Sequence, residues 1–316
     1  MNQSSENAIG SEENSDRQLL RLAAASAVYA LGKQILGLQA TLTVLGGFAS
    51  PIVVATFPQL KVWAAFYAFS VALLDALVLE RLQSDRRQTG AKIQELFDCD
   101  LFHLPWRRMV VGEPPTPEVV TEEGSRYKRR HKDFSHLRDW YSPAVSRLSL
   151  PLARLVCQRT NAWWDSTLRK RYCTSLKVLL WGLVLFVFAL AIHRGMTMDV
   201  FVLAVLAPLT PAILWGVREI RKNSSAADDL GKLQTHIDGL WRDALAGHLA
   251  GDALEEESVL IQNQVFHSRS KNPFVFNWVY RVLRGEKEKT MHEVAGQLVE
   301  QALQAHASHR SGAPTT

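Results

Sequence analysis

Four stretches of the chain consist almost entirely of apolar residues. Segments 34–60, 178–193 and 200–217 contain no Asp, Glu, Lys or Arg, and segment 62–79 contains only Asp75. A helix rises about 1.5 Å per residue, so 18 residues span about 27 Å, close to the roughly 30 Å hydrocarbon core of a bilayer. Helices of soluble proteins seldom stay apolar on every face for this length. The pattern therefore predicts four membrane-spanning helices.

The four apolar stretches form two pairs, each joined by a short turn. One hairpin is predicted over 34–79, with its turn near Pro58, and a second over 173–217, with its turn near Arg194. The first helix of the second hairpin is long enough to span a bilayer when it begins at residue 173 and Lys177 extends its ammonium group to the interface.

The remaining segments have the pattern of helices. Apolar residues recur at helical spacing in 226–246, and period-2 alternation is not convincing anywhere. We therefore predict an all-α membrane protein, with four transmembrane helices in two hairpins and a helical cytosolic domain. The predicted segments are an N-terminal cytosolic segment (1–33), a first transmembrane hairpin (34–79), a cytosolic segment (80–172), a second transmembrane hairpin (173–217), a C-terminal helical cytosolic segment (218–305) and a disordered tail (306–316).

Two helix starts are predicted in the C-terminal segment. Asp252 and Glu255 have the spacing of a capping box. Asn272 followed by Pro273 resembles an N-cap residue with proline in the first helical position.

Lys and Arg are distributed unevenly along the chain. Of the 36 in the sequence, 34 lie outside the two turns, which contain only Lys61 and Arg194. Positive residues collect on the cytoplasmic side of membrane helices, so both chain ends and segment 80–172 are predicted to be cytoplasmic. Segment 80–177 contains 19 Lys and Arg against 12 Asp and Glu. This excess of positive charge favours an anionic partner.

The stretch CQRTNAWWDSTLRKRYC places two adjacent tryptophans among basic residues, directly before an apolar segment. Trp and basic residues are enriched at membrane interfaces, so an interfacial belt explains Trp164, Arg169 and Arg171. Arg159 and Trp163 lie further from the apolar segment. Aromatic rings with arginines also suit a nucleotide, whose bases stack and whose phosphates accept hydrogen bonds from guanidinium groups. The residues alone favour the belt and leave a ligand site open.

Three residues of the apolar segments are candidates for a pore or a gate. Asp75 is a carboxylate within an apolar stretch, where it faces a partner or water, or else extends to the nearby interface. Pro208 and Pro211 remove backbone donors from the fourth helix and predict a kink, which is either a gate or a fixed shape.

The motifs of common enzymes are not found in the sequence. It contains no glycine-rich phosphate loop, no GxSxG and no HExxH. His131 and His136 are five residues apart, whereas metal-binding pairs on a helix prefer four. The three cysteines form no CxxC pair. We therefore expect no catalytic residues, no metal site and no cofactor.

Four motifs in order resemble the SMODS-associated four-transmembrane effector family. They are AKIQELFDCDLFHLPW (91–106), LRDWYSPAV (137–145), ARLVCQRTNAWWDSTLRKRY (153–172) and IQNQVFHSRSKNPFVFNWVYRVLR (261–284). The resemblance extends from about Arg17 to Ala305 and includes both hairpins. It departs at Ala162, where a cysteine is common, and at Asn263 and Gln264, where an acidic pair is common.

The resemblance implies an effector of bacterial anti-phage systems that signal with cyclic oligonucleotides (CBASS). It implies that a partner enzyme, a cyclic-oligonucleotide synthase, makes the second messenger and that the effector permeabilises the inner membrane as a pore. We also expect a homo-oligomer. With an anionic ligand expected, Arg159, Trp163, Trp164, Arg169 and Arg171 become candidate contacts. The alternatives are a constitutive ion channel or transporter, and a membrane-anchored enzyme or scaffold that acts through its cytosolic domain.

Overall fold

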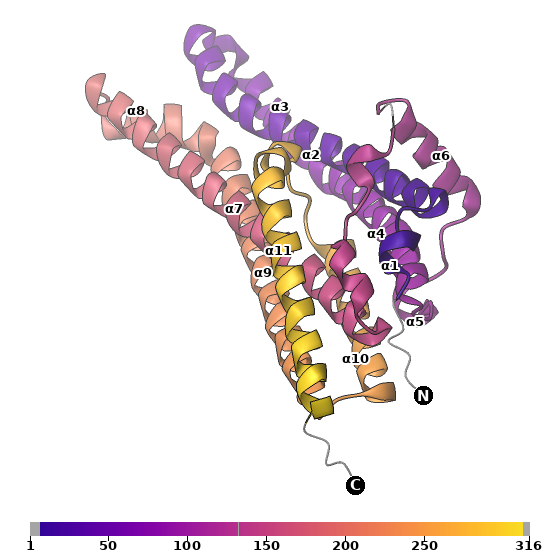
Figure 1. The fold of residues 1–316 in the computed structure, drawn as a ribbon. Helices are drawn as coiled ribbons and strands as arrows, with labels where there is room; N and C mark the ends of the chain where they lie inside the picture. The colour runs from indigo at the N-terminus through magenta and orange to yellow at the C-terminus, as the bar shows by residue number, and fades with distance from the viewer. Residues whose placement is uncertain (1–6, 132, 312–316) are drawn as a thin grey trace.

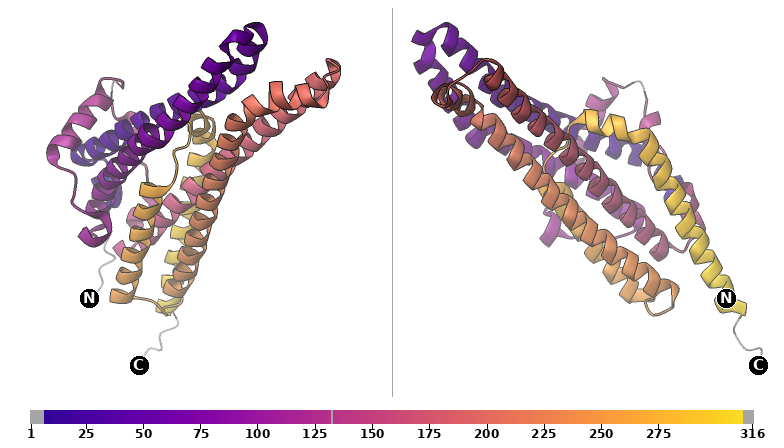
Figure 2. Two further views of the ribbon diagram at one scale, coloured as in Figure 1. Left: turned by 180° about the vertical axis from the view of Figure 1, so that it is seen from behind. Right: turned by 90° about the vertical axis from the view of Figure 1, so that its left-hand side faces the viewer.

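Two helical hairpins project from a helical body. The computed structural model describes residues 7–131 and 133–311. The first hairpin pairs α2 (Asp16–Thr56) with α3 (Lys61–Leu74) through η1 (Pro58–Leu60), and the second pairs α7 (Leu150–His193) with α8 (Met198–Phe201), η5 (Val202–Leu206) and the start of α9 (Ala207–Leu245). Both hairpins project from the same end of the body, and the described chain begins and ends toward the other end (Figures 1 and 2).

Three described helices are long and apolar enough to cross a membrane, by length and composition: Asp16–Ser50, Val62–Phe102 and Leu150–His193. The fourth apolar segment is divided among α8, η5 and α9 and packs on α7, where Val187 and Phe201 are buried together. No strand occurs in residues 7–131 or 133–311. The predicted all-α membrane class, with its two hairpins, is confirmed.

Large apolar side chains on the hairpins are exposed in the single chain. Trp63 of α3 and Trp181 of α7 are 67% and 66% exposed. Phe66, Phe69 and Phe186 are also exposed. A continuous apolar surface of this kind is unfavourable in water and favourable against lipid acyl chains. The hairpins therefore have the surface of membrane-spanning elements.

The helical body has one main apolar core and several smaller apolar clusters. Its main helices are α4 (Glu80–Phe102), α10 (Gly251–Lys271), α11 (Asn277–Ser311) and the body ends of α7 and α9. Its shorter elements are α1 (Ile9–Glu12), α5 (Arg108–Val111), α6 (Pro117–Lys128), η3 (Ser135–Leu137) and η4 (Pro143–Arg147). Fully buried core residues include Phe97, Phe102, Leu155, Ile237, Ile261 and Val299.

The helices of the hairpins continue into the body without a break. α2, α7 and α9 have 41, 44 and 39 residues, more than a bilayer needs. α3 passes into α4 through a π-helical segment, η2 (Asp75–Leu79). The predicted boundary at residue 173 lies inside α7. The body and the hairpins therefore share continuous helices.

Three predicted boundaries differ from the structure. Residues 272–276 are not helical, and α11 begins at Asn277, because the buried side chains of Phe274 and Val275 anchor an extended segment. α10 begins at Gly251 without a side-chain cap, so the predicted capping box does not form. α11 continues to Ser311, past residue 306, and the rest of the predicted tail lies outside the described residues.

Candidate functional site

The body contains a cavity of about 580 Å³. Its walls come from α2, α4, α6, α7, α9, α10 and α11, from η3 and the loop before it, and from the segment between α10 and α11. Figure 1 shows this last segment at the end of the body from which the hairpins project. A volume of this size suits a small-molecule ligand. The cavity therefore lies where a bound ligand touches helices that continue into both hairpins.

Basic side chains dominate the charged lining of this cavity. Asp165 is the only carboxylate among the lining residues. The lining Lys and Arg residues come from six parts of the chain and are Lys33, Arg87, Arg126, Arg130, Arg169, Arg269 and Arg281. His131 and His136 also line the cavity. This excess of cations gives a strongly positive potential inside the walls, which favours an anionic ligand.

Three of the lining arginines are neutralised by carboxylates. Arg169 Nε lies 3.0 Å from Asp165 Oδ1, and Arg126 Nη1 lies 3.3 Å from Glu123 Oε2. Arg269 pairs with Asp98, whose side chain is buried behind the wall.

The other four lining cations are Lys33, Arg87, Arg130 and Arg281. They make no ion pair with any residue in the described ranges 7–131 and 133–311. These side chains are available to an anion in the cavity.

Aromatic rings form a second part of the lining. Trp164 lies at the centre, with its ring centroid 5.8 Å from that of Trp140 and 5.9 Å from that of Tyr280, both edge-on. Tyr29 and Phe274 pair edge-on at 6.2 Å elsewhere in the cavity. Flat rings beside free arginines are what a nucleotide requires, because bases stack on rings and phosphates pair with guanidinium groups.

A buried polar network holds the wall in place. Asp98 accepts hydrogen bonds from Arg269, Gln262 and the Tyr141 hydroxyl. Tyr141 in turn accepts from Asn161 Nδ2 at 2.8 Å. Burial by itself lowers the pKa of Arg269, but the Asp98 carboxylate and nearby tyrosines raise it above its ordinary value. Arg269 is therefore a fixed cation of the wall.

The structure brings together two of the five ligand contacts predicted from sequence. Trp164 and Arg169 line the cavity. Arg159 does not, because α7 turns it toward α9, where its Nε lies 2.5 Å from Asp238 Oδ1. Trp163 is half-buried beside Trp164 but outside the lining, and Arg171 is exposed on the surface.

Sequence reasoning missed most of the lining. Lys33, Arg87 and Arg281 belong to helices far apart in the chain, and each looks there like part of a solvated face. Two signals were available. Trp140 and Tyr280 lie within motifs that carry the family resemblance, and Arg130 lies in the basic run that follows α6.

The three membrane candidates lie apart from the cavity. Asp75 begins the π segment η2 and accepts from Gln39 Nε2 of α2 at 2.5 Å, while Gln39 Oε1 accepts from Gln83 Nε2 at 2.9 Å. Pro208 and Pro211 lie in the first turns of α9, directly after the π segment η5. Each proline removes one backbone donor from this region, but α9 continues as an α-helix through Pro211.

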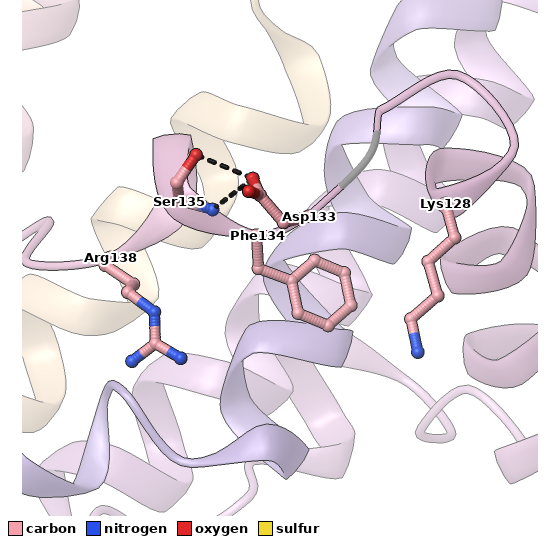
Figure 3. A pocket seen from close by; sticks show the side chains of 5 residues that line it. All are labelled: Lys128, Asp133, Phe134, Ser135 and Arg138. Carbon is pink, nitrogen blue, oxygen red and sulfur yellow. Dashed lines mark hydrogen bonds between the residues drawn. The ribbon is translucent and has the colours of Figure 1, made fainter.

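A second hollow of about 540 Å³ lies at the loop after α6 (Figure 3). Its lining residues are Lys128, Asp133, Phe134, Ser135 and Arg138. Asp133 Oδ1 accepts from the backbone N–H and the hydroxyl of Ser135, at 3.0 and 2.6 Å. No cluster of three metal-ligating side chains occurs among the residues that the structure describes. Few charged or aromatic side chains line this hollow, so the larger cavity remains the candidate site.

Comparisons with known proteins identify a family and a relative. The model of a family described as "SMODS-associating 4TM effector domain" matches residues 7–298. A protein from Bacillus cereus (strain VD146) described as "Probable CBASS effector molecule" is 23% identical over 229 residues, which cover 71% of this chain and 74% of that relative. No solved structure matches the chain.

Proposed function

Because the chain belongs to the SMODS-associating 4TM effector domain family, we propose that it is a CBASS effector that permeabilises the bacterial inner membrane when a cyclic oligonucleotide binds in its cavity. The observation that carries the proposal is the composition of the cavity lining. It contains seven Lys and Arg residues and a cluster of aromatic rings, but one carboxylate, Asp165. The cavity walls are also the body ends of helices that form the hairpins.

A cyclic oligonucleotide has the chemistry that this lining complements. Its phosphodiester groups are negatively charged. They can pair with Lys33, Arg87, Arg130 and Arg281, which make no direct ion pair with a carboxylate in the described part of the chain. Guanidinium–phosphate hydrogen bonds are charge-assisted and often bidentate. The bases stack on Trp164 and its neighbours, with a contribution of about 1–3 kcal/mol per base.

The proposed topology puts the body in the cytoplasm, where a cyclic-oligonucleotide synthase makes the ligand. The charge distribution supports this, since only Lys61 and Arg194 lie at the hairpin turns. In the single chain, large apolar side chains of α3 and α7 are exposed. These surfaces are free to contact lipid or other copies of the chain. We propose that the active form is a homo-oligomer that assembles through these hairpins.

Dye release from liposomes tests the function. The full-length chain is reconstituted with a trapped dye, and cyclic di- and trinucleotides are added one at a time, with their linear counterparts as controls. We expect one cyclic compound to trigger release and to bind with matching affinity in calorimetry. Equal release without any nucleotide favours a constitutive channel. A cyclic compound that binds without release favours a membrane-anchored enzyme or scaffold, and both results contradict the proposal.

A further inference from the structure

Residues 272–276 connect α10 to α11 and form one wall of the cavity. We call this segment the strap. It is extended rather than helical, and Phe274 and Val275 within it are buried. It lies at the end of the body from which the hairpins project (Figure 1), and its residues from Asn272 to Val275 line the cavity. A ligand in the cavity therefore touches the strap directly.

The strap also contacts the helices of the first hairpin. The Phe274 ring packs on α2 at Gly32, so closely that a Cβ added to Gly32 lies 2.2 Å from Phe274 Cζ. The guanidinium carbon of Arg87 in α4 lies over the same ring, 5.6 Å from its centroid. Phe274 is thus held between the body ends of two helices that continue into the first hairpin.

Arg169 joins the strap to the second hairpin. Its Nη1 donates to the carbonyl oxygen of Pro273 at 2.9 Å and to Asn223 Oδ1 of α9 at 2.8 Å. Arg169 itself belongs to α7 and is 6% exposed. The strap therefore packs against α2 and α4 through Phe274 and is hydrogen-bonded to Arg169 of α7, which in turn is hydrogen-bonded to α9.

Two of the unpaired cavity cations contact the strap or the residue that follows it. Lys33 Nζ donates to Asn277 Oδ1 at 2.8 Å and lies 5.9 Å from the centroid of the Tyr280 ring. Arg87 lies over Phe274, and its Nε is buried with no hydrogen-bond partner in the described part of the chain. A buried donor without an acceptor is costly, so this position favours an incoming acceptor. These direct contacts of the two cations are with neutral groups, and their nearest carboxylates, Asp165 for Lys33 and Glu80 and Glu219 for Arg87, act only at longer range.

We propose that Lys33 and Arg87 form a phosphate subsite, and that a phosphodiester group bound there releases the strap from α2 and α4. The inference rests on the proposed function and names the part of the cavity that links binding to the membrane. An ionised phosphate oxygen is a stronger acceptor than the Asn277 amide or the Phe274 ring. It therefore competes with the contacts that hold the strap, and it binds the released state better, as a conformational switch requires.

Hydrogen exchange tests the subsite without knowledge of the natural ligand. The full-length protein is exposed to inorganic phosphate or to chloride at equal ionic strength, and the exchange of peptides that cover 272–276 is compared. We expect phosphate to speed exchange in the wild type and to have no effect in the double variant Lys33→Gln, Arg87→Gln. Equal exchange of the wild type in phosphate and in chloride overturns the subsite.

Variants of the strap test the link to the membrane. Phe274→Ala removes the contact with α2, and Gly32→Ala pushes the ring away, so each is expected to raise dye release without nucleotide several-fold. Trp278→Ala is the matched control, because Trp278 is 43% exposed and outside the cavity lining. Phe274→Leu keeps most of the packing and should be intermediate. Release at the wild-type level in both Phe274→Ala and Gly32→Ala contradicts a role for the strap.

Different results would refute the proposed function and the phosphate subsite. A wild-type protein that binds no cyclic oligonucleotide and releases no dye refutes the proposed function. A wild-type protein that does both, with unchanged affinity in Lys33→Gln and Arg87→Gln, refutes only the subsite. We expect each substitution to weaken binding of the active cyclic compound about tenfold or more.

Discussion

Arg269 of α10 and Asp98 of α4 form a buried ion pair behind the cavity, with Arg269 Nη1 2.5 Å from Asp98 Oδ2. Their side chains are 12% and 1% exposed. Asp98 receives two further hydrogen bonds, from Tyr141 and Gln262. The pair joins two helices that are distant in sequence and fixes the wall on which the ligand site is built.

Removal of Arg269 should destabilise the body strongly. Arg269→Met leaves the Asp98 carboxylate buried without its cation, which typically costs about 3–5 kcal/mol. Arg17→Met is the control, since Arg17 pairs with Asp100 at the surface and is 68% exposed. Such a pair contributes about 1 kcal/mol or less. Thermal unfolding in detergent measures both variants, and an equally small loss for the two contradicts the role of the buried pair.

Cavity cations should matter for binding where surface cations do not. Arg130→Ala and Arg281→Ala each remove an unpaired charge from the lining, and affinity for the activating nucleotide is expected to fall about tenfold. Arg171→Ala is the matched surface control and should bind like the wild type. Calorimetry in detergent gives the three affinities. Loss of affinity in Arg171→Ala alone would contradict a ligand site in the cavity. It would favour a site at the juxtamembrane residues predicted from the sequence.

Stability should decline as the pH rises because of Glu13. Burial raises the pKa of Glu13 to about 8, against the lowering effect of the Tyr141 N–H that donates to its Oε2. The folded state thus binds the proton more tightly than the unfolded state, whose carboxyl group titrates near 4.5. Stability from this group is complete below pH 4.5 and is lost as the pH rises toward about 8.

The variant Glu13→Gln removes this titration. We expect its melting temperature to exceed that of the wild type by a few degrees at pH 8 and by much less at pH 5. Circular dichroism melts at both pH values measure the difference. A difference in melting temperature between the two proteins that is the same at pH 5 and pH 8 would show that Glu13 is not protonated in the folded state.

Asp75 is expected to influence permeation. It ends a chain of side-chain hydrogen bonds through Gln39 to Gln83, so a carboxylate among apolar helices has a polar path toward the body. Asp75→Asn keeps this geometry but removes the charge, and it should alter ion conductance in the activated protein without loss of insertion. Planar bilayer recordings test this. Unchanged conductance would make Asp75 a structural residue of η2.

Topology can be tested in cells with a reporter that is active only in the periplasm. A fusion after Thr316 should be silent, and an insertion at Thr197, the residue before α8, should be active. The uneven distribution of Lys and Arg predicts this pattern, because positive residues remain in the cytoplasm. The reverse pattern would invert the membrane orientation.

The sequence motifs indicate the family, but only the fold shows which of their residues line the cavity. Trp164 and Arg169 were identified from the aromatic and basic character of one stretch, and both line the cavity. Arg159 has the same local character and points to Asp238 instead. Residues on one helix face different partners according to helical phase and packing, so local composition cannot separate ligand contacts from structural ion pairs.

The sequence by itself determined the all-α membrane class, the two hairpins and the excess of positive charge in the body. Each is a local or additive property, because a bilayer requires uninterrupted apolar runs and charge is a sum over residues. Only the tertiary structure decided where that charge converges. Lys33 and Asn277, 244 positions apart, meet beside the cavity, and Arg87 meets Phe274 there. Such meetings depend on how the faces of seven helices pack, which no periodicity along the chain encodes.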